Sequence, residues 1–205
     1  MSSSAHPGIN LGGGDPKAQR ESETPAFGFW VFLMSDLIIF GVLFAHYVVM
    51  TGARAGGPGP STLFDLRSVA AQTFLLLASS FTYGMASLAL KHQRQVRPVA
   101  IWLIVTAALG AAFVLLELRD FVNMVGEGGP PQRSGFLSAL WALTGLHWLH
   151  VTAGLVWIAT MLALLSRFGL SDRNKTRLLL LGLYWHFLDL IWIGILSVVY
   201  LGGLA

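Results

Sequence analysis

The chain lacks cysteine and is poor in charge, and both absences narrow its class. None of its 205 residues is Cys, which excludes disulfide bonds, thiolate metal sites and covalent haem attachment through a C-x-x-C-H motif. Charged residues make up only 11% of the chain, whereas a soluble domain usually carries about 25%. The sequence also contains no nucleophile elbow, phosphate loop or dinucleotide fingerprint. No redox or nucleotide chemistry is therefore visible in the chain itself.

Hydrophobic residues are abundant in the chain. They make up 55% of the chain, including seven Trp and thirteen Phe, and this composition indicates a polytopic membrane protein. A sequence pI near 9.6 could suggest nucleic-acid binding. However, the basic residues cluster in short loops between apolar runs, where they set membrane orientation. We therefore expect membrane lipids, and no nucleic acid, among the partners.

Five apolar runs follow a polar N-terminal stretch. Residues 1–24 are rich in Gly and Ser and have too little apolar content to pack, so we expect a flexible tail there. Each apolar run is long enough to cross a bilayer as a helix, which takes about 20 residues. The approximate spans are 27–50, 69–90, 99–118, 136–165 and 178–201. The sequence thus predicts an all-α fold in which residues 25–205 form a bundle of five transmembrane helices.

Basic residues are shared unevenly between the two ends of this bundle. Nine of them fall on the side of the N-terminal tail: Lys17, Arg20, Lys91, Arg94, Arg97, Arg167, Arg173, Lys175 and Arg177. Four fall on the opposite side: Arg54, Arg67, Arg119 and Arg133. The positive-inside rule therefore predicts a cytoplasmic N-terminus and a periplasmic C-terminus.

Polar residues inside the apolar runs are the candidate functional residues, because ionisable groups in a membrane usually face a bundle interior. If each run is centred on the bilayer, four of these residues fall within about 5 Å of the midplane: Asp36, His150, His186 and Asp189. His147 lies one turn from His150, and His186 shares a helix face with Asp189. A second layer, about 10 Å or more towards the outside, contains His46, Gln72 and Glu117.

Three interpretations of the central layer are open. The favoured one is a buried hydrogen-bonded network in which His donates to Asp and neither group faces lipid unpaired. The second is a metal or haem site, because two His at i, i+3 with further His and carboxylates from other helices can ligate a metal. The third is proton conduction. Membrane di-metal oxygenases use many more histidines than the six here, which counts against the metal interpretation.

Several motifs resemble subunit III of the haem–copper oxidases. They are Met34-Ser35-Asp36, Glu117, Thr144-Gly145-x-His147-x-x-His150-Val151-x-x-Gly154 and Trp185-His186-Phe187-x-Asp189-x-x-Trp192. The resemblance extends from about Gly28 to Gly203. The stretches 73–77, 83–86 and 133–139 are similar to the five-helix subunit III of cytochrome bo type ubiquinol oxidases. Subunit III of cytochrome c oxidases usually has two more helices at its N-terminus.

This resemblance implies an accessory subunit without a redox centre of its own, in a proton-pumping ubiquinol oxidase of a bacterial inner membrane. Haem and copper would belong to subunit I, which this chain would contact directly, with subunits II and IV in the same complex. It would bind phospholipid between its helices, stabilise the complex and support proton uptake. The alternatives are the homologous subunit of a cytochrome c oxidase or nitric oxide reductase, and a stand-alone membrane metal or haem protein that uses the central histidines.

The chain departs from the quinol-oxidase pattern at one position. In that pattern a Glu precedes Thr-Phe-Leu-Leu-Leu, and here the position is Gln72. An amide cannot ionise. A proton-handling role tied to that carboxylate is therefore left open for this chain.

Overall fold

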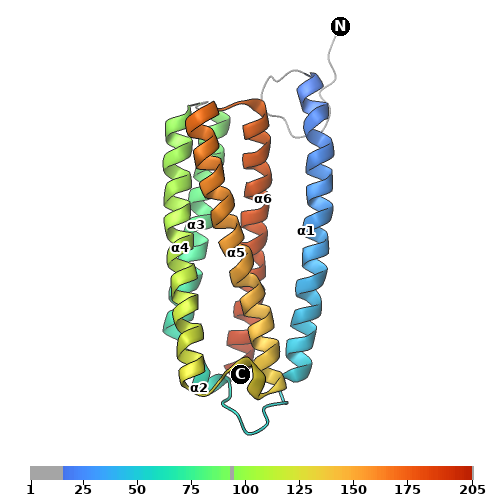
Figure 1. Ribbon diagram of the computed structural model, residues 1–205, viewed down its shortest axis with the longest axis vertical. Coiled ribbons are helices and arrows are strands. Elements are labelled where there is room, and N and C mark those ends of the chain that lie inside the picture. The colour runs from blue at the N-terminus through green and yellow to red at the C-terminus, as the bar shows by residue number, and fades with distance from the viewer. Residues whose placement is uncertain (1–15, 93–94, 205) are drawn as a thin grey trace.

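A computed structural model describes residues 16–92 and 95–204 (Figure 1). Its elements, in chain order, are α1 (Pro16–Met50), α2 (Pro60–Leu63), α3 (Leu66–His92), α4 (Val96–Gly126), the 3-10 helix η1 (Pro131–Arg133), α5 (Gly135–Phe168), α6 (Asp172–Ile195), the π-helical η2 (Leu196–Leu201) and α7 (Gly202–Leu204). Five helices are long and apolar enough to cross a membrane, and the described residues contain no strand. The predicted all-α fold with five spans is thereby confirmed.

Two helices extend beyond the apolar runs that predicted them. α1 begins at Pro16, inside the stretch expected to be a tail, and residues 1–15 lie outside the described part of the chain. α4 continues to Gly126, well past the end of its apolar run. A helix satisfies its backbone hydrogen bonds internally, so its end is set by caps and side-chain partners and need not coincide with the last apolar residue.

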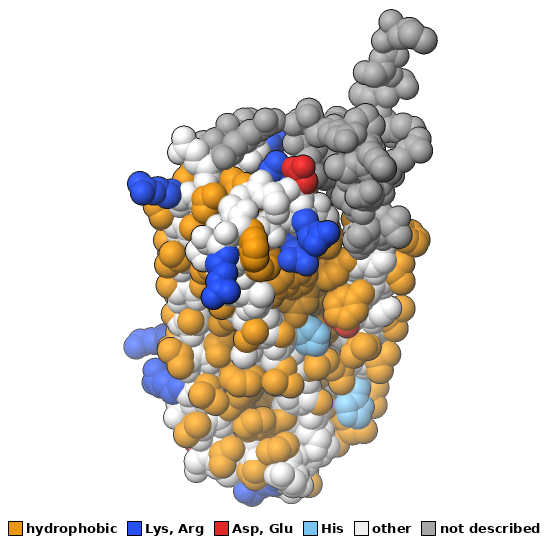
Figure 2. All heavy atoms as spheres, turned by 45° about the horizontal axis from the view of Figure 1, so that its top comes forward, with side chains coloured by type: hydrophobic (Ala, Val, Ile, Leu, Met, Phe, Trp, Pro, Cys, Tyr) orange, Lys and Arg blue, Asp and Glu red, His pale blue; other side chains and the backbone are white. Residues whose placement is uncertain are grey.

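α6 is the central helix of the bundle. It packs against α1, α3 and α5, and 61% of the apolar window of its span is buried, against 17% for the span of α1. In Figure 1 α1 stands at one side, while α3, α4, α5 and α6 group together. Figure 2 shows mainly hydrophobic side chains over the visible sides of the molecule, with several Lys and Arg side chains near its upper end. The bundle therefore has one buried helix, α6, and one peripheral helix, α1.

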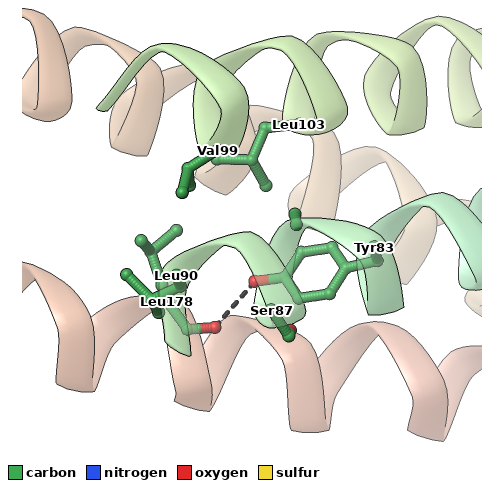
Figure 3. Close-up of a pocket in the computed structure, with 7 residues that line it drawn as sticks. Tyr83, Ser87, Leu90, Val99, Leu103 and Leu178 are labelled. Atoms are coloured by element: carbon green, nitrogen blue, oxygen red, sulfur yellow. Dashed lines mark hydrogen bonds between the residues drawn. The ribbon is translucent and has the colours of Figure 1, made fainter. Parts of the chain in front are cut away.

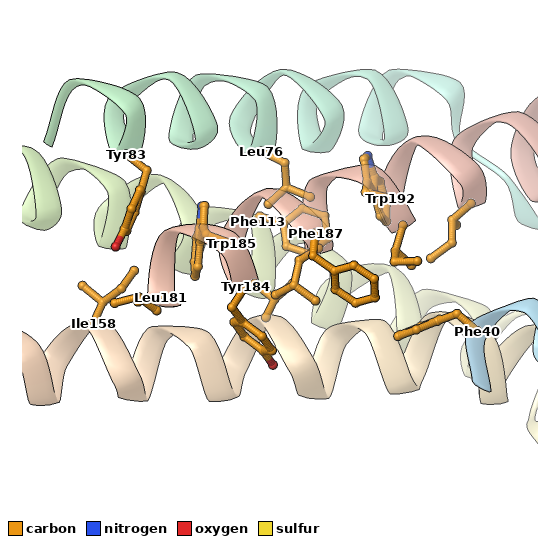
Figure 4. Close-up of a cluster of buried hydrophobic side chains, with 14 of the residues drawn as sticks. Phe40, Leu76, Tyr83, Phe113, Ile158, Leu181, Tyr184, Trp185, Phe187 and Trp192 are labelled. Atoms are coloured by element: carbon orange, nitrogen blue, oxygen red, sulfur yellow. The ribbon is translucent and has the colours of Figure 1, made fainter. Parts of the chain in front are cut away.

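The packing around α6 depends on two glycines of neighbouring helices that leave space for the ring of Trp185. A Cβ atom added to Gly110 on α4 or Gly154 on α5 would lie 2.9 Å from the ring of Trp185, so neither position leaves room for a side chain. The indole nitrogen of Trp185 donates to Ser79 Oγ on α3 at 3.1 Å. Figure 4 shows Trp185 in the row of buried side chains along α6, with Leu181 and Trp192. One side chain thus joins α6 to three neighbouring helices.

Serine caps fix the starts of the last two long helices. Ser134 Oγ accepts a hydrogen bond from the backbone N–H of Leu137 at the start of α5, and Ser171 Oγ accepts one from Asn174 at the start of α6. Such caps satisfy amide groups that have no partner within the helix. α5 ends at Gly169, whose φ of 61° suits a residue without a Cβ atom. The cap at Ser171 fixes where α6 begins, so the Trp-His-Phe segment at residues 185–187 lies within this helix.

Candidate functional site

Polar residues lie at mid-depth in four of the five membrane spans. Polar residues within two positions of a span midpoint are Ser79 and Thr152, which bond to the backbone of their own helices, and four more: Asp36 in α1, Ser80 in α3, His150 in α5 and His186 in α6. Two positions correspond to about 3 Å of helix rise. The structure brings these four residues together in two separate groups, Asp36 with His150 and Ser80 with His186.

The first group joins α1 to α5. His150 Nε2 lies 3.5 Å from Asp36 Oδ2. The other ring nitrogen of His150 hydrogen-bonds to the carbonyl of Leu146, one turn earlier on α5. The ring of Phe40 packs edge-on against that of His150. Tyr184 on α6 donates its hydroxyl to the carbonyl of His150 at 2.9 Å, so α1, α5 and α6 meet at this point.

The second group joins α3 to α6. His186 Nδ1 lies 2.8 Å from Ser80 Oγ and 3.7 Å from Asp189 Oδ2. The second distance is too long for a hydrogen bond. Both carboxylate oxygens of Asp189 are buried without a hydrogen-bond partner in the described part of the chain. The His186 side chain is 49% exposed and faces the outside of the bundle, unlike the interior position expected for it.

His147 occupies a different environment from His150. Its side chain is buried, its ring stacks on Trp192, and the rings of Phe40 and Phe113 pack edge-on against it. Neither of its ring nitrogens has a hydrogen-bond partner among the described residues. The two histidines of the His-x-x-His motif are therefore not a converging pair.

The expected outer layer divides in two. Gln72 and Glu117 are buried between α3 and α4, whereas His46 is exposed on the surface of α1. Gln72 Nε2 donates to Asp120 Oδ2 at 2.9 Å, and Ser68 Oγ donates to the same oxygen at 2.6 Å. The amide at position 72 therefore supplies a donor to a carboxylate, which an ionised Glu could not do.

Sequence reasoning did not single out three residues that complete these groups. They are Ser68 and Ser80 on α3 and Asp120 on α4. Asp120 lies three positions after Glu117, and that spacing on one helix face was an available signal. The serines carried no signal, because single hydroxyls are common in membrane helices and can bond to their own backbone. Only the packing of α3 identifies their partners.

A recess lies where α3, α4 and the start of α6 meet (Figure 3). It is lined by Tyr83, Ala86, Ser87, Leu90, Val99, Leu103 and Leu178. The Tyr83 hydroxyl donates to the Leu178 carbonyl at 2.7 Å. The cavity volume of the recess is about 10 Å³, about the space that one water molecule needs, whereas pockets for drug-sized ligands begin at about 300 Å³. This recess is too small to be such a ligand pocket.

The polar groups of the described residues can exchange hydrogen bonds across helices. Among the described residues, no three His, Asp or Glu side chains are grouped so that they could hold a metal ion. The two mid-depth groups contain donors and acceptors within contact distance across helices. Their geometry is suited to joining helices or passing a proton locally.

These features define a helical integral membrane protein with polar contacts between helices at mid-depth. The chain belongs to the cytochrome c oxidase subunit III family, whose model matches residues 19–204. It is 47% identical to cytochrome bo(3) ubiquinol oxidase subunit 3 of Pseudomonas putida over 86% of this chain and 84% of that protein. It is 42% identical to quinol oxidase subunit 3 of Bacillus subtilis (strain 168), over 87% of each chain.

The resemblance deduced from the sequence motifs is thereby confirmed. So is the expected localisation, because five spans and relatives among bacterial respiratory oxidase subunits support a multi-pass protein of the inner membrane. The orientation of the termini remains a prediction from the charge distribution.

Proposed function

We propose that this chain is subunit III of a proton-pumping ubiquinol oxidase, which oxidises ubiquinol and reduces dioxygen to water. The observation that carries the proposal is the 42–47% identity to relatives named as subunit 3 of quinol oxidases, over most of both chains. The five candidate spans of the described residues are consistent with this branch.

Within the complex the chain is a non-catalytic subunit. In the part of the chain that the structure describes, no three His, Asp or Glu side chains are grouped so that they could hold a metal ion, and the polar contacts at mid-depth connect helices. Haem and copper belong to subunit I in this proposal. The direct partner is subunit I, with subunits II and IV in the same assembly and phospholipid around the exposed apolar helices.

The two mid-depth groups hold neighbouring helices together. The Asp36–His150 contact connects the sparsely buried α1 to α5, and the Ser80–His186 contact connects α3 to α6. In hydrocarbon a polar side chain gains by pairing with another, because lipid tails offer it no partner. Positioning of the bundle is the primary role of these residues, and local proton transfer in support of proton uptake is the second.

Affinity purification and gene deletion test the proposal together. Tagged chain extracted in mild detergent should co-purify with a haem-bearing subunit I and ubiquinol oxidase activity. Deletion of the gene should lower the amount of that oxidase or shorten its lifetime during turnover. Unchanged subunit composition, activity and lifetime in the deletion strain would contradict the proposal.

A second candidate function is the homologous subunit of a cytochrome c oxidase, because the matching family model carries that description. The two assignments differ in the electron donor of the purified complex. Oxidation of ubiquinol supports the first assignment, and oxidation of reduced cytochrome c without ubiquinol activity supports the second.

A further inference from the structure

The central helix α6 exposes a single narrow stripe of side chains. Between Leu181 and Ile195 its exposed residues are Leu183, His186, Leu190 and Ile193, and we call this stripe the α6 seam. The positions alternate in steps of three and four, which is the spacing of a seam that receives another helix. Every other position from Leu181 to Ile195 is buried or half-buried.

The seam lies between the two helices that flank α6 on this side. Trp185 and Trp192 of α6 bond to side chains of α3, while Gly194 lies against Phe44 of α1. On a helix with 3.6 residues per turn, the seam positions fall between these two directions. The seam is therefore an uncovered face of α6 with α3 on one side and α1 on the other.

A polar group is exposed at the centre of this seam. His186 is within one residue of the midpoint of its span, and its side chain is half-exposed. Its Nδ1 bonds to Ser80 Oγ, and no described residue forms a hydrogen bond with its Nε2. The adjacent Asp189 has two carboxylate oxygens without a hydrogen-bond partner among those residues. The half-exposed imidazole is costly in contact with lipid tails, which can neither donate nor accept, whereas the Asp189 oxygens are buried within the bundle.

We propose that the α6 seam is the docking surface for a transmembrane helix of another oxidase subunit, one that places a hydroxyl or amide side chain against His186 at mid-bilayer depth. This inference rests on the proposed function, since it requires a multi-subunit complex. A hydroxyl or amide group fits because each can both donate and accept, and so satisfies either tautomer of the imidazole. The apolar seam residues above and below His186 provide the packing surface for the rest of that helix.

A photo-crosslinking residue at the seam tests the inference in the intact complex. p-Benzoylphenylalanine replaces Leu190 in the seam or, as the control, Leu115 on α4. The match is close: the two leucines are 65% and 66% exposed, and each lies about four positions beyond the midpoint of its span. Irradiation of native membranes should join the Leu190 variant, and not the Leu115 variant, to another oxidase subunit, which mass spectrometry of the adduct identifies.

The other outcomes separate the inference from the function on which it rests. If the chain co-purifies with the oxidase but the Leu190 variant crosslinks only to lipid or to a second copy of this chain, the docking surface is overturned and the proposed function stands. If the Leu115 variant gives the same subunit adduct, the seam has no special status and the inference also fails. If the chain does not co-purify with any oxidase, the proposed function fails and the inference with it.

A pair of substitutions tests the hydrogen bond itself. His186→Gln keeps a group that can donate and accept, whereas His186→Leu removes it. In detergent, the ratio of bound to free chain should fall about threefold for His186→Leu, since hydrogen bonds between membrane helices are individually weak. It should stay near the wild-type ratio for His186→Gln. Equal ratios for His186→Leu and the wild type would show that no partner group binds His186.

Discussion

His150 Nε2 lies 3.5 Å from Asp36 Oδ2, and this contact ties the least buried spanning helix to the bundle. Only 17% of the apolar window of the α1 span is buried, so α1 has little packing area to hold it against α5. Its remaining contacts include the ring pairs of Phe29 with Trp157 and Tyr47 with Phe136. A polar contact at mid-depth between two aromatic contacts fixes both the position and the rotation of α1.

We first predict that Asp36→Leu loosens α1. The change leaves His150 Nε2 without its acidic neighbour in an apolar setting, and membrane hydrogen bonds average about 0.6 kcal/mol with a maximum near 1.7 kcal/mol. Asp36→Asn should have a smaller effect, because the amide oxygen still accepts a hydrogen bond. The readout is the rate at which protease cleaves α1 in the detergent-solubilised complex. Cleavage at the wild-type rate in Asp36→Leu would show that the contact does not hold α1.

The second prediction concerns Asp189. Asp189→Asn should retain the chain in the purified complex nearly as well as the wild type, because the amide is still polar and accepts a hydrogen bond. Asp189→Leu should lower retention, since it removes the carboxylate beside His186. Because Asp189 Oδ2 lies 3.7 Å from a half-exposed His186, the cost should be near the average of about 0.6 kcal/mol for a polar contact between membrane helices.

Subunit retention through a detergent wash measures that effect, with proton uptake as a second readout. Full retention of Asp189→Leu would exclude a structural role for the carboxylate. Full retention of both variants with slowed proton uptake would favour proton transfer over packing as the role of this group.

The third prediction concerns the close approach of α5 to Trp185. A Cβ atom at Gly154 would lie 2.9 Å from the indole ring, so Gly154→Ala forces either the ring or the helix to move. We expect a loss of about 1–3 kcal/mol, as for other overpacked cores. Gly145→Ala on the same helix is the control, because no atom lies within 4 Å of the added Cβ. Thermal denaturation of the purified complex compares the two, and equal midpoints would refute the packing argument.

The fourth prediction concerns topology. Nine basic residues on one side of the predicted bundle against four on the other indicate a cytoplasmic N-terminus and, with five spans, a periplasmic C-terminus. Alkaline phosphatase fused after Ala205 should therefore be active, and green fluorescent protein at the same position should be dark. The reverse pattern would require the whole bundle to be inverted.

The sequence by itself determined the membrane class, the number of spans and the family. Apolar runs of sufficient length are read directly from composition, because the bilayer imposes one length on every span. Depth remains a prediction from the sequence: Asp36, His150 and His186 each lie within two positions of the midpoint of a candidate span, and a helix rises by a constant amount per residue. The helix ends beyond the apolar runs did not follow, because caps and partners from other helices set them.

Only the tertiary structure decided which residues at one depth meet. Depth is a property of each helix alone, whereas contact depends on how each helix is rotated and which neighbour it faces. His186 turned outward to Ser80, His147 was enclosed by aromatic rings, and His46 was left on the surface. The bundle thus separated the expected central network into two mid-depth groups, because side-chain packing around Trp185 fixes the rotation of α6. Gln72 of the expected outer layer lies apart from both, against Asp120.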